Sequence, residues 1–89
     1  MIERELTVSN RLGLHARATA KLVQLLSAYR CNATLTAKGR EVNAKSIMGV
    51  MLLAAGQGTV VRLRVDGEDE ERAADVVAAL FERRFDEDE

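Results

Sequence analysis

The sequence contains few residues of several types, and each shortage limits what the protein can do. It has no tryptophan, one tyrosine and two phenylalanines, so it offers no aromatic platform on which nucleobases could stack. Its formal net charge of −1 provides no electrostatic attraction for nucleic acid. Its single cysteine, Cys31, cannot form an internal disulfide, and no second ligand nearby indicates a metal site. We therefore expect neither a nucleic-acid partner nor a metal, and we interpret Cys31 as a small buried apolar residue.

Long hydrophobic segments are also lacking. No apolar run reaches the length needed to span a bilayer, and the charged N-terminal residues 1–5 do not resemble a signal peptide. With 89 residues, 47% of them hydrophobic, the chain has the size and composition of one small globular domain. We therefore predict a cytoplasmic protein without a membrane partner. It would consist of one domain over residues 1–85 and a solvated acidic tail over residues 86–89.

The hydrophobic pattern predicts four strands and three helices. Segments with strand character cover residues 2–8, 31–36, 41–43 and 59–66. Helical periodicity begins at Ala16, after Ser46 and at Glu68. The resulting order, βαββαβα, is typical of an α+β fold in which helices cover one face of a four-stranded antiparallel sheet.

The most informative residue is His15, the only histidine, which stands where the first helix begins. The amide groups of Ala16 and Arg17 have no partner within the helix and can bind an anion. The guanidinium of Arg17 suits phosphate, and Gly13 lets the backbone turn tightly. A neutral imidazole here predicts a phosphoryl acceptor with Arg17 as its stabilising cation. The simpler alternative is a surface or capping histidine, and the sequence does not indicate which ring nitrogen reacts.

The second helix is predicted to combine a cap with an exposed apolar face. Ser46 stands directly before it and is first of all an N-cap. The apolar residues in the segment 47–53 are too many for one buried stripe, and we expect Val50 and Leu53 to belong to the core. The remaining apolar side chains predict an exposed patch that binds a partner, and methionines suit a surface that must fit several partners.

Two motifs together resemble a known family. The segment 13–17 (GLHAR) and the segment 44–51 (AKSIMGVM) are similar to the HPr family, the histidine-containing phosphocarrier proteins of the bacterial phosphoenolpyruvate-dependent phosphotransferase system. The similarity covers essentially the whole chain, including the turn at residues 56–59. It implies an open-faced β-sandwich and a monomeric carrier without a cofactor. The Nδ1 atom of His15 would accept a phosphoryl group from phospho-enzyme I and pass it to an enzyme IIA domain, while Arg17 orients and neutralises the group.

The resemblance also implies roles for surface residues. The face that meets enzyme I and enzyme IIA would comprise Ala20, Gln24, Ile47, Met48 and Met51. Some members of the family are phosphorylated by a dedicated kinase, HPr kinase/phosphorylase, on the serine that corresponds to Ser46. A regulatory role for Ser46 therefore stands beside its role as a cap. The chain departs from the family at Ala18, where proline is usual, and we expect a less rigid helix start with an intact site.

Two other classes of function fit parts of the sequence. A small acylphosphatase-like hydrolase would need a group that positions water near Arg17, and Asn10 is the only local candidate. A purely regulatory docking module would act through phosphorylation of Ser46 alone and would not need His15. The two motifs favour a phosphocarrier over both. They do not choose between the carbohydrate and the nitrogen-related branch of the phosphotransferase system.

Overall fold

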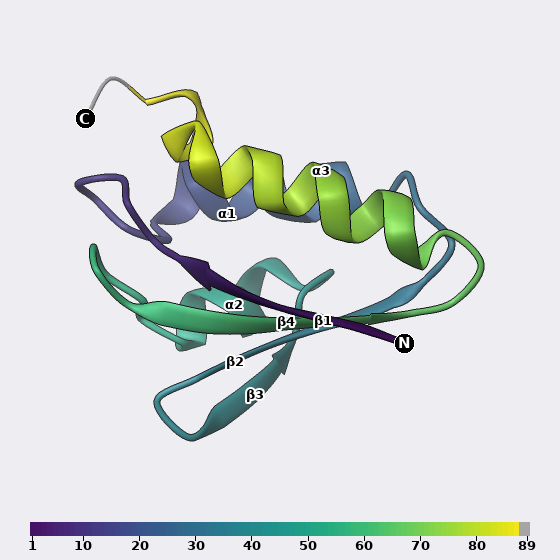
Figure 1. Cartoon of the computed structure of the whole chain (residues 1–89). Coiled ribbons are helices and arrows are strands. Elements are labelled where there is room, and N and C mark those ends of the chain that lie inside the picture. The colour runs from purple at the N-terminus through teal and green to yellow at the C-terminus, as the bar shows by residue number, and fades with distance from the viewer. Residues whose placement is uncertain (88–89) are drawn as a thin grey trace.

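The computed structural model describes residues 1–87, and its elements follow the predicted order (Figure 1). The strands are β1 (Ile2–Thr7), β2 (Asn32–Ala37), β3 (Arg40–Asn43) and β4 (Val60–Asp66). The helices are α1 (Ala16–Leu26), α2 (Ile47–Leu52) and α3 (Glu70–Glu82), followed by a short 3-10 turn, η1 (Arg84–Asp86). None of the helices within residues 1–87 is long and apolar enough to cross a membrane.

The four strands form one antiparallel sheet in the order β1-β4-β2-β3. The central strand β4 shows the predicted alternation, because Val61, Leu63 and Val65 are fully buried while Val60 and Arg62 are exposed. Val65 lies opposite Ile2 of β1 and Ala33 of β2, whereas Leu63 lies opposite the apolar Leu35 of β2 but Arg4 of β1. The predicted α+β fold with a four-stranded antiparallel sheet is confirmed.

Helices α1 and α3 lie side by side over one face of the sheet, and α2 contacts α1 and β3 (Figure 1). Leu22 and Leu26 of α1 and Val77 of α3 are fully buried in the core between helices and sheet. Charged side chains cross-link the strands outside this core. Arg64 lies 3.3 Å from Glu3 and 3.8 Å from Glu41, all three of them exposed or partly exposed. The helix-covered face therefore holds the core, as the alternating pattern requires.

The side chains of Val50, Leu53 and Cys31 differ in burial. Val50 and Leu53 are 0% and 3% exposed, which confirms them as core residues. Cys31 packs against the core but is only partly buried, so its interpretation as a buried apolar residue is confirmed only in part. The reason is its position just before β2, where it lines a surface hollow together with Asn32 and Lys45.

A close contact between two loops fixes the entry to α1. Gly13 has φ +68°, and a Cβ atom at this position would lie 2.5 Å from the carbonyl oxygen of Ala55. The next residue, Leu14, donates its backbone N–H to the same oxygen at 2.9 Å. Only glycine allows this backbone conformation and this approach together.

Candidate functional site

His15 is the N-cap of α1. Its backbone is extended (φ −76°, ψ −179°), and its Nδ1 atom accepts a hydrogen bond from the backbone N–H of Arg17 at 3.3 Å. The side chain is 28% exposed. The structure thus confirms the capping position that the sequence allowed, with Nδ1 turned toward the unpaired amides of the first helical turn.

The loop before His15 is held by buried hydrogen bonds. Asn10 is fully buried, and its Nδ2 atom donates to the carbonyl oxygen of Gly13 at 2.8 Å. The hydroxyl of Thr19 donates to the carbonyl oxygen of Leu14 at 3.1 Å. These contacts fix the backbone on both sides of the histidine. They also engage the amide of Asn10, which the sequence offered as a water-positioning group for a hydrolase.

Glu87 lies directly against the histidine, which the sequence did not indicate. Its Oε2 atom is 2.5 Å from Nε2 of His15, and its Oε1 atom accepts from Nδ2 of Asn10 at 3.0 Å. Burial alone would raise the pKa of the Glu87 carboxyl, but the hydrogen bonds from Asn10 and His15, together with the charge of Arg17, hold this pKa below its ordinary value. Glu87 is therefore a carboxylate at neutral pH.

At Glu87 this arrangement corrects the expectation of a solvated acidic tail over residues 86–89. The side chain of Glu87 is only 15% exposed because it is enclosed by the site, whereas the side chain of Asp86 is 50% exposed. Asp88 and Glu89, the other two residues of the predicted tail, lie outside the described residues.

A left-handed turn carries the chain from α3 to the site. Arg84, Phe85 and Asp86 all have positive φ angles, between 56° and 62°. Such conformations cost about 1–2 kcal/mol per residue. Part of this cost is offset because Phe85 is fully buried against Phe81, with ring centroids 4.9 Å apart, and burying a phenylalanine contributes about 1.5–3 kcal/mol. The only sequence signal for this anchor is an apolar residue four positions after Phe81.

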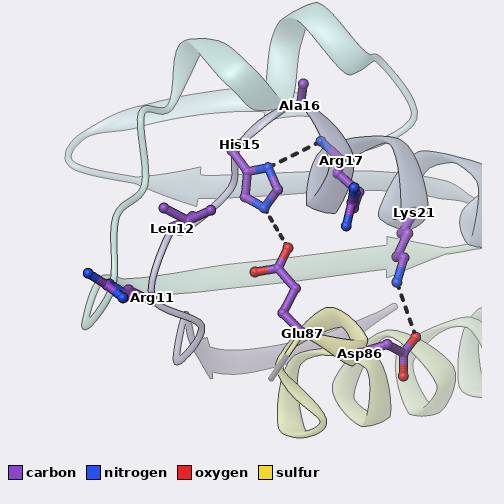
Figure 2. Close-up of a pocket in the computed structure, with 8 residues that line it drawn as sticks. All are labelled: Arg11, Leu12, His15, Ala16, Arg17, Lys21, Asp86 and Glu87. Carbon is purple, nitrogen blue, oxygen red and sulfur yellow. Dashed lines mark hydrogen bonds and ion pairs between the residues drawn. The ribbon is translucent and has the colours of Figure 1, made fainter. Parts of the chain in front are cut away.

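Lys21 of α1 holds the same turn from the other side. Its Nζ atom donates to the carbonyl oxygen of Phe85 at 2.8 Å and lies 3.5 Å from the carboxylate of Asp86 (Figure 2). The C-terminal segment is therefore attached to α1 as well as to α3, and its path past the histidine is fixed.

These residues surround an open cavity of about 660 Å³ at the start of α1 (Figure 2). Figure 2 shows Arg17 between His15 and Lys21, on the wall that α1 provides. The cavity is large enough for a phosphoryl group. The cations and helix amides on its α1 side favour an anion, whereas Asp86 and Glu87 contribute carboxylates from the C-terminal segment. Its lining comprises Arg11, Leu12, His15, Ala16, Arg17, Lys21, Asp86 and Glu87. The structure thus brings His15, Ala16 and Arg17 together, as the sequence predicted.

Ser46 is the N-cap of α2, as predicted. Its Oγ atom accepts a hydrogen bond from the backbone N–H of Gly49 at 3.0 Å, and its backbone is extended (φ −112°, ψ 118°). The hydroxyl therefore satisfies an amide at the start of a helix of six residues.

The apolar residues of α2 leave a large exposed surface beside the site. Ile47, Met48 and Met51 are 45%, 77% and 43% exposed, which confirms the predicted patch. Leu52, which the count of surplus apolar residues also covers, is 62% exposed, and Leu12 (67% exposed) is a further exposed apolar residue that the sequence reasoning did not include. Helix α1, which carries the half-buried Ala20 and the exposed Gln24, packs against α2.

Ala18 replaces the proline that the resemblance leads one to expect, and α1 forms around it. The helix starts at Ala16, its cap is formed, and Ala18 is fully buried in the core. An alanine in the first turn preserves the helix because its backbone and small side chain fit this position.

Comparison with known proteins gives one consistent result. The chain matches the family model described as PTS HPr component phosphorylation site over residues 2–83. It is 69% identical over 88 residues to the phosphocarrier protein HPr of Xylella fastidiosa strain Temecula1, with 99% of each chain covered. It is 52% identical to the phosphocarrier protein HPr of Cupriavidus necator strain H16, with 100% of each chain covered.

A solved structure supports the same assignment. HPr-C-His from Thermoanaerobacter tengcongensis is similar with a TM-score of 0.96 and 40% sequence identity, and 100% of both chains is covered. Fold, family model and close relatives therefore agree. The chain belongs to the HPr family of the phosphoenolpyruvate-dependent phosphotransferase system, as a phosphocarrier protein that carries a phosphoryl group and is not an independent enzyme.

Proposed function

We propose that Nδ1 of His15 is the atom that carries the phosphoryl group. The observation that supports this is the position of Nδ1, 3.3 Å from the backbone N–H of Arg17 at the mouth of a cation-lined cavity. The lone pair of Nδ1 forms the new bond to phosphorus while the bond from phosphorus to the donor breaks, and no water takes part. The amides of Ala16 and Arg17 and the guanidinium of Arg17 face the charge of the transferred group.

The exposed surface next to the site suits the two proteins between which a carrier moves. Phospho-enzyme I would load the histidine and an enzyme IIA domain would unload it, both in the cytoplasm. Both proteins would bind to one surface of α1 and α2. This docking face comprises Ala20, Gln24, Ile47, Met48 and Met51. Exposed apolar side chains around a charged cavity allow two different partners to use one site in turn, because methionines adapt to different surfaces.

The proposal is tested with enzyme I and phosphoenolpyruvate. The chain should gain one acid-labile phosphoryl group, and His15→Ala should gain none. Arg17→Ala should remain folded and accept the group roughly 10- to 100-fold more slowly, because a charge-assisted contact contributes about 1.5–3 kcal/mol. Arg72→Ala, which removes an exposed arginine of α3, is the matched control. Full acid-labile phosphorylation of His15→Ala would refute the assignment.

We also propose that Ser46 is a regulatory phosphorylation site, as a substrate of HPr kinase/phosphorylase. Its Oγ atom caps α2 beside the exposed side chains of Ile47 and Met48. A phosphate on this atom would place a dianion within an apolar docking surface, which would weaken docking by the cost of desolvating it. Ser46→Asp should slow loading by enzyme I while Ser46→Ala should not. Equal rates for the two variants would contradict this role.

A further inference from the structure

The chain leaves helix α2 through a strained residue. Ala54, the second residue after α2, has φ +49°, in the left-handed region that favours glycine at a helix end. Among residues 1–87, and outside the turn at residues 84–86, the only other non-glycine residue with a positive φ is Lys38, at the tip of the β2–β3 hairpin. These two residues contact each other, because Nζ of Lys38 donates a hydrogen bond to the carbonyl oxygen of Ala54 at 3.0 Å.

The hairpin holds the same end of α2 at a second point. Arg40, the first residue of β3, donates from its Nη1 atom to the carbonyl oxygen of Leu52 at 3.1 Å. The last carbonyls of a helix have no partner within it, and the partial negative charge at this end favours cations. Helix α2 has no basic residue in its own last turn. The β2–β3 hairpin therefore provides the two cations that bind the end of α2.

The residue after Ala54 makes the contact that fixes the entry to α1. The carbonyl oxygen of Ala55 accepts from the backbone N–H of Leu14 at 2.9 Å, and the same oxygen is the atom that a Cβ at position 13 would meet. Leu53 and Ala55 are both buried, whereas Ala54 between them is exposed. A backbone rotation at Ala54 would carry the Ala55 carbonyl with it, and through Leu14 it would shift the next residue, His15.

We propose that Lys38 is a positioning residue for phosphoryl transfer, a role that rests on His15 being the carrier. Its hydrogen bond stabilises the strained conformation of Ala54, which persists only if its surroundings hold it. This conformation directs the Ala55 carbonyl to the loop that carries the histidine. Lys38 is not among the described residues that line the cavity at the start of α1. Its removal therefore changes the position of the site's backbone and leaves the groups that line the cavity in the chain.

Phosphoryl transfer from phospho-enzyme I provides the first test. Lys38→Ala should lower kcat for this transfer roughly 3- to 10-fold with little change in KM, which is the factor expected for one hydrogen bond. Glycine adopts a positive φ without strain. Adding Ala54→Gly to the Lys38→Ala chain should therefore restore most of the lost rate, although the charge is still missing. Arg72→Ala, which removes an exposed cation of α3, is the control and should transfer at the parent rate.

Hydrogen exchange tests the same connection without phosphorylation. In the full unphosphorylated chain, the amide of Leu14 should exchange faster in Lys38→Ala than in the parent, and adding Ala54→Gly should slow it again. The amides of the central strand β4 should exchange at the parent rate in all three chains. Equal acceleration at Leu14 and in β4 would reveal a general loss of stability and would overturn the positioning role.

Two results of the transfer experiment would also overturn the proposal. One is a parent rate in Lys38→Ala. The other is a slow rate that Ala54→Gly does not restore, because the charge of Lys38 would then act on enzyme I directly. If the parent chain gained no phosphoryl group on His15, the carrier assignment would fail. The exchange of the Leu14 amide would still decide whether Lys38 holds the loop.

Discussion

Two helices of this protein begin in the same way and lead to different chemistry. His15 and Ser46 both have an extended backbone, and each accepts a hydrogen bond from an amide of the helix that it caps, at 3.3 Å and 3.0 Å. Behind the ring of His15 lies the carboxylate of Glu87, whereas exposed apolar side chains follow Ser46. A cap at a helix start is therefore common to both. The two caps differ in the capping side chain, an imidazole in one and a hydroxyl in the other, and in the group that contacts this side chain from its other side.

The largest effect is expected when one cap is exchanged for the other. His15→Ser gives α1 the same capping residue as α2, and serine is a favourable N-cap. The variant should unfold within about 1 kcal/mol of the parent chain in urea. It should nevertheless accept no acid-labile phosphoryl group from enzyme I, because a hydroxyl oxygen lacks the basicity of imidazole. If this variant gained an acid-labile phosphoryl group, the location at the start of α1, and not the imidazole ring, would be what allows the transfer.

Two glycines near the caps, Gly13 before His15 and Gly49 after Ser46, provide the second contrast. Gly13 has a positive φ, and its Cβ would meet the backbone of Ala55 at 2.5 Å. Gly49 has no such φ, and its Cβ would meet the hydroxyl of Ser46 at 3.2 Å. Gly13→Ala should lower the free energy of unfolding by about 2 kcal/mol or more, because the turn and the loop contact are both strained.

Gly49→Ala serves as the comparison variant. The gain in helix propensity, about 1 kcal/mol, offsets the crowding at Ser46, so its stability should stay within about 1 kcal/mol of the parent. Urea denaturation of the two variants measures the difference. If Gly13→Ala were as stable as Gly49→Ala, the close approach of the loops would not be what positions the histidine.

The same contrast explains how much of the site the sequence predicts. Both caps are local features, because the capping residue and the amides it binds lie within three positions of each other. The alternation of β4 is equally local, and Val61, Leu63 and Val65 are buried as expected. The order of strands and helices along the chain followed from such patterns, and with it the fold class, whereas the order of the strands within the sheet did not. The exposed apolar face of α2 followed from counting apolar residues in a short helix.

Glu87 could not be predicted in this way. It meets His15 across 72 positions of sequence, through a turn in which three non-glycine residues adopt left-handed conformations. No local preference indicates such a turn, since these residues favour it only once Phe85 is buried. A run of acidic residues at a chain end is ordinarily solvated, and the tertiary anchor of Phe85 overrides that preference.

The smallest expected effect is on the pH dependence of stability, which should involve Glu87 behind the cap His15 but not the cap Ser46. Burial raises the pKa of Glu87, but the hydrogen bonds from Asn10 and His15 and the charge of Arg17 leave it lowered. A carboxyl with a lowered pKa in the folded state stabilises the fold above its ordinary pKa of about 4.3, and this stabilisation is lost as pH falls through the lowered value.

The free energy of unfolding should therefore differ between the parent chain and Glu87→Gln above about pH 5 and converge as the pH falls through the lowered pKa of Glu87, with a maximum difference of about 1 kcal/mol. Glu70 and Asp86 also have a lowered pKa, through hydrogen bonds with the N-terminal ammonium and with Arg83, respectively. Both residues are present in both proteins, so their contributions cancel in the difference between the two free energies of unfolding. Ser46→Ala loses a non-titrating cap, so its cost of about 1 kcal/mol should not vary with pH. Urea denaturation from pH 3 to pH 7 compares the variants, because Glu87 contributes through its charge and Ser46 does not.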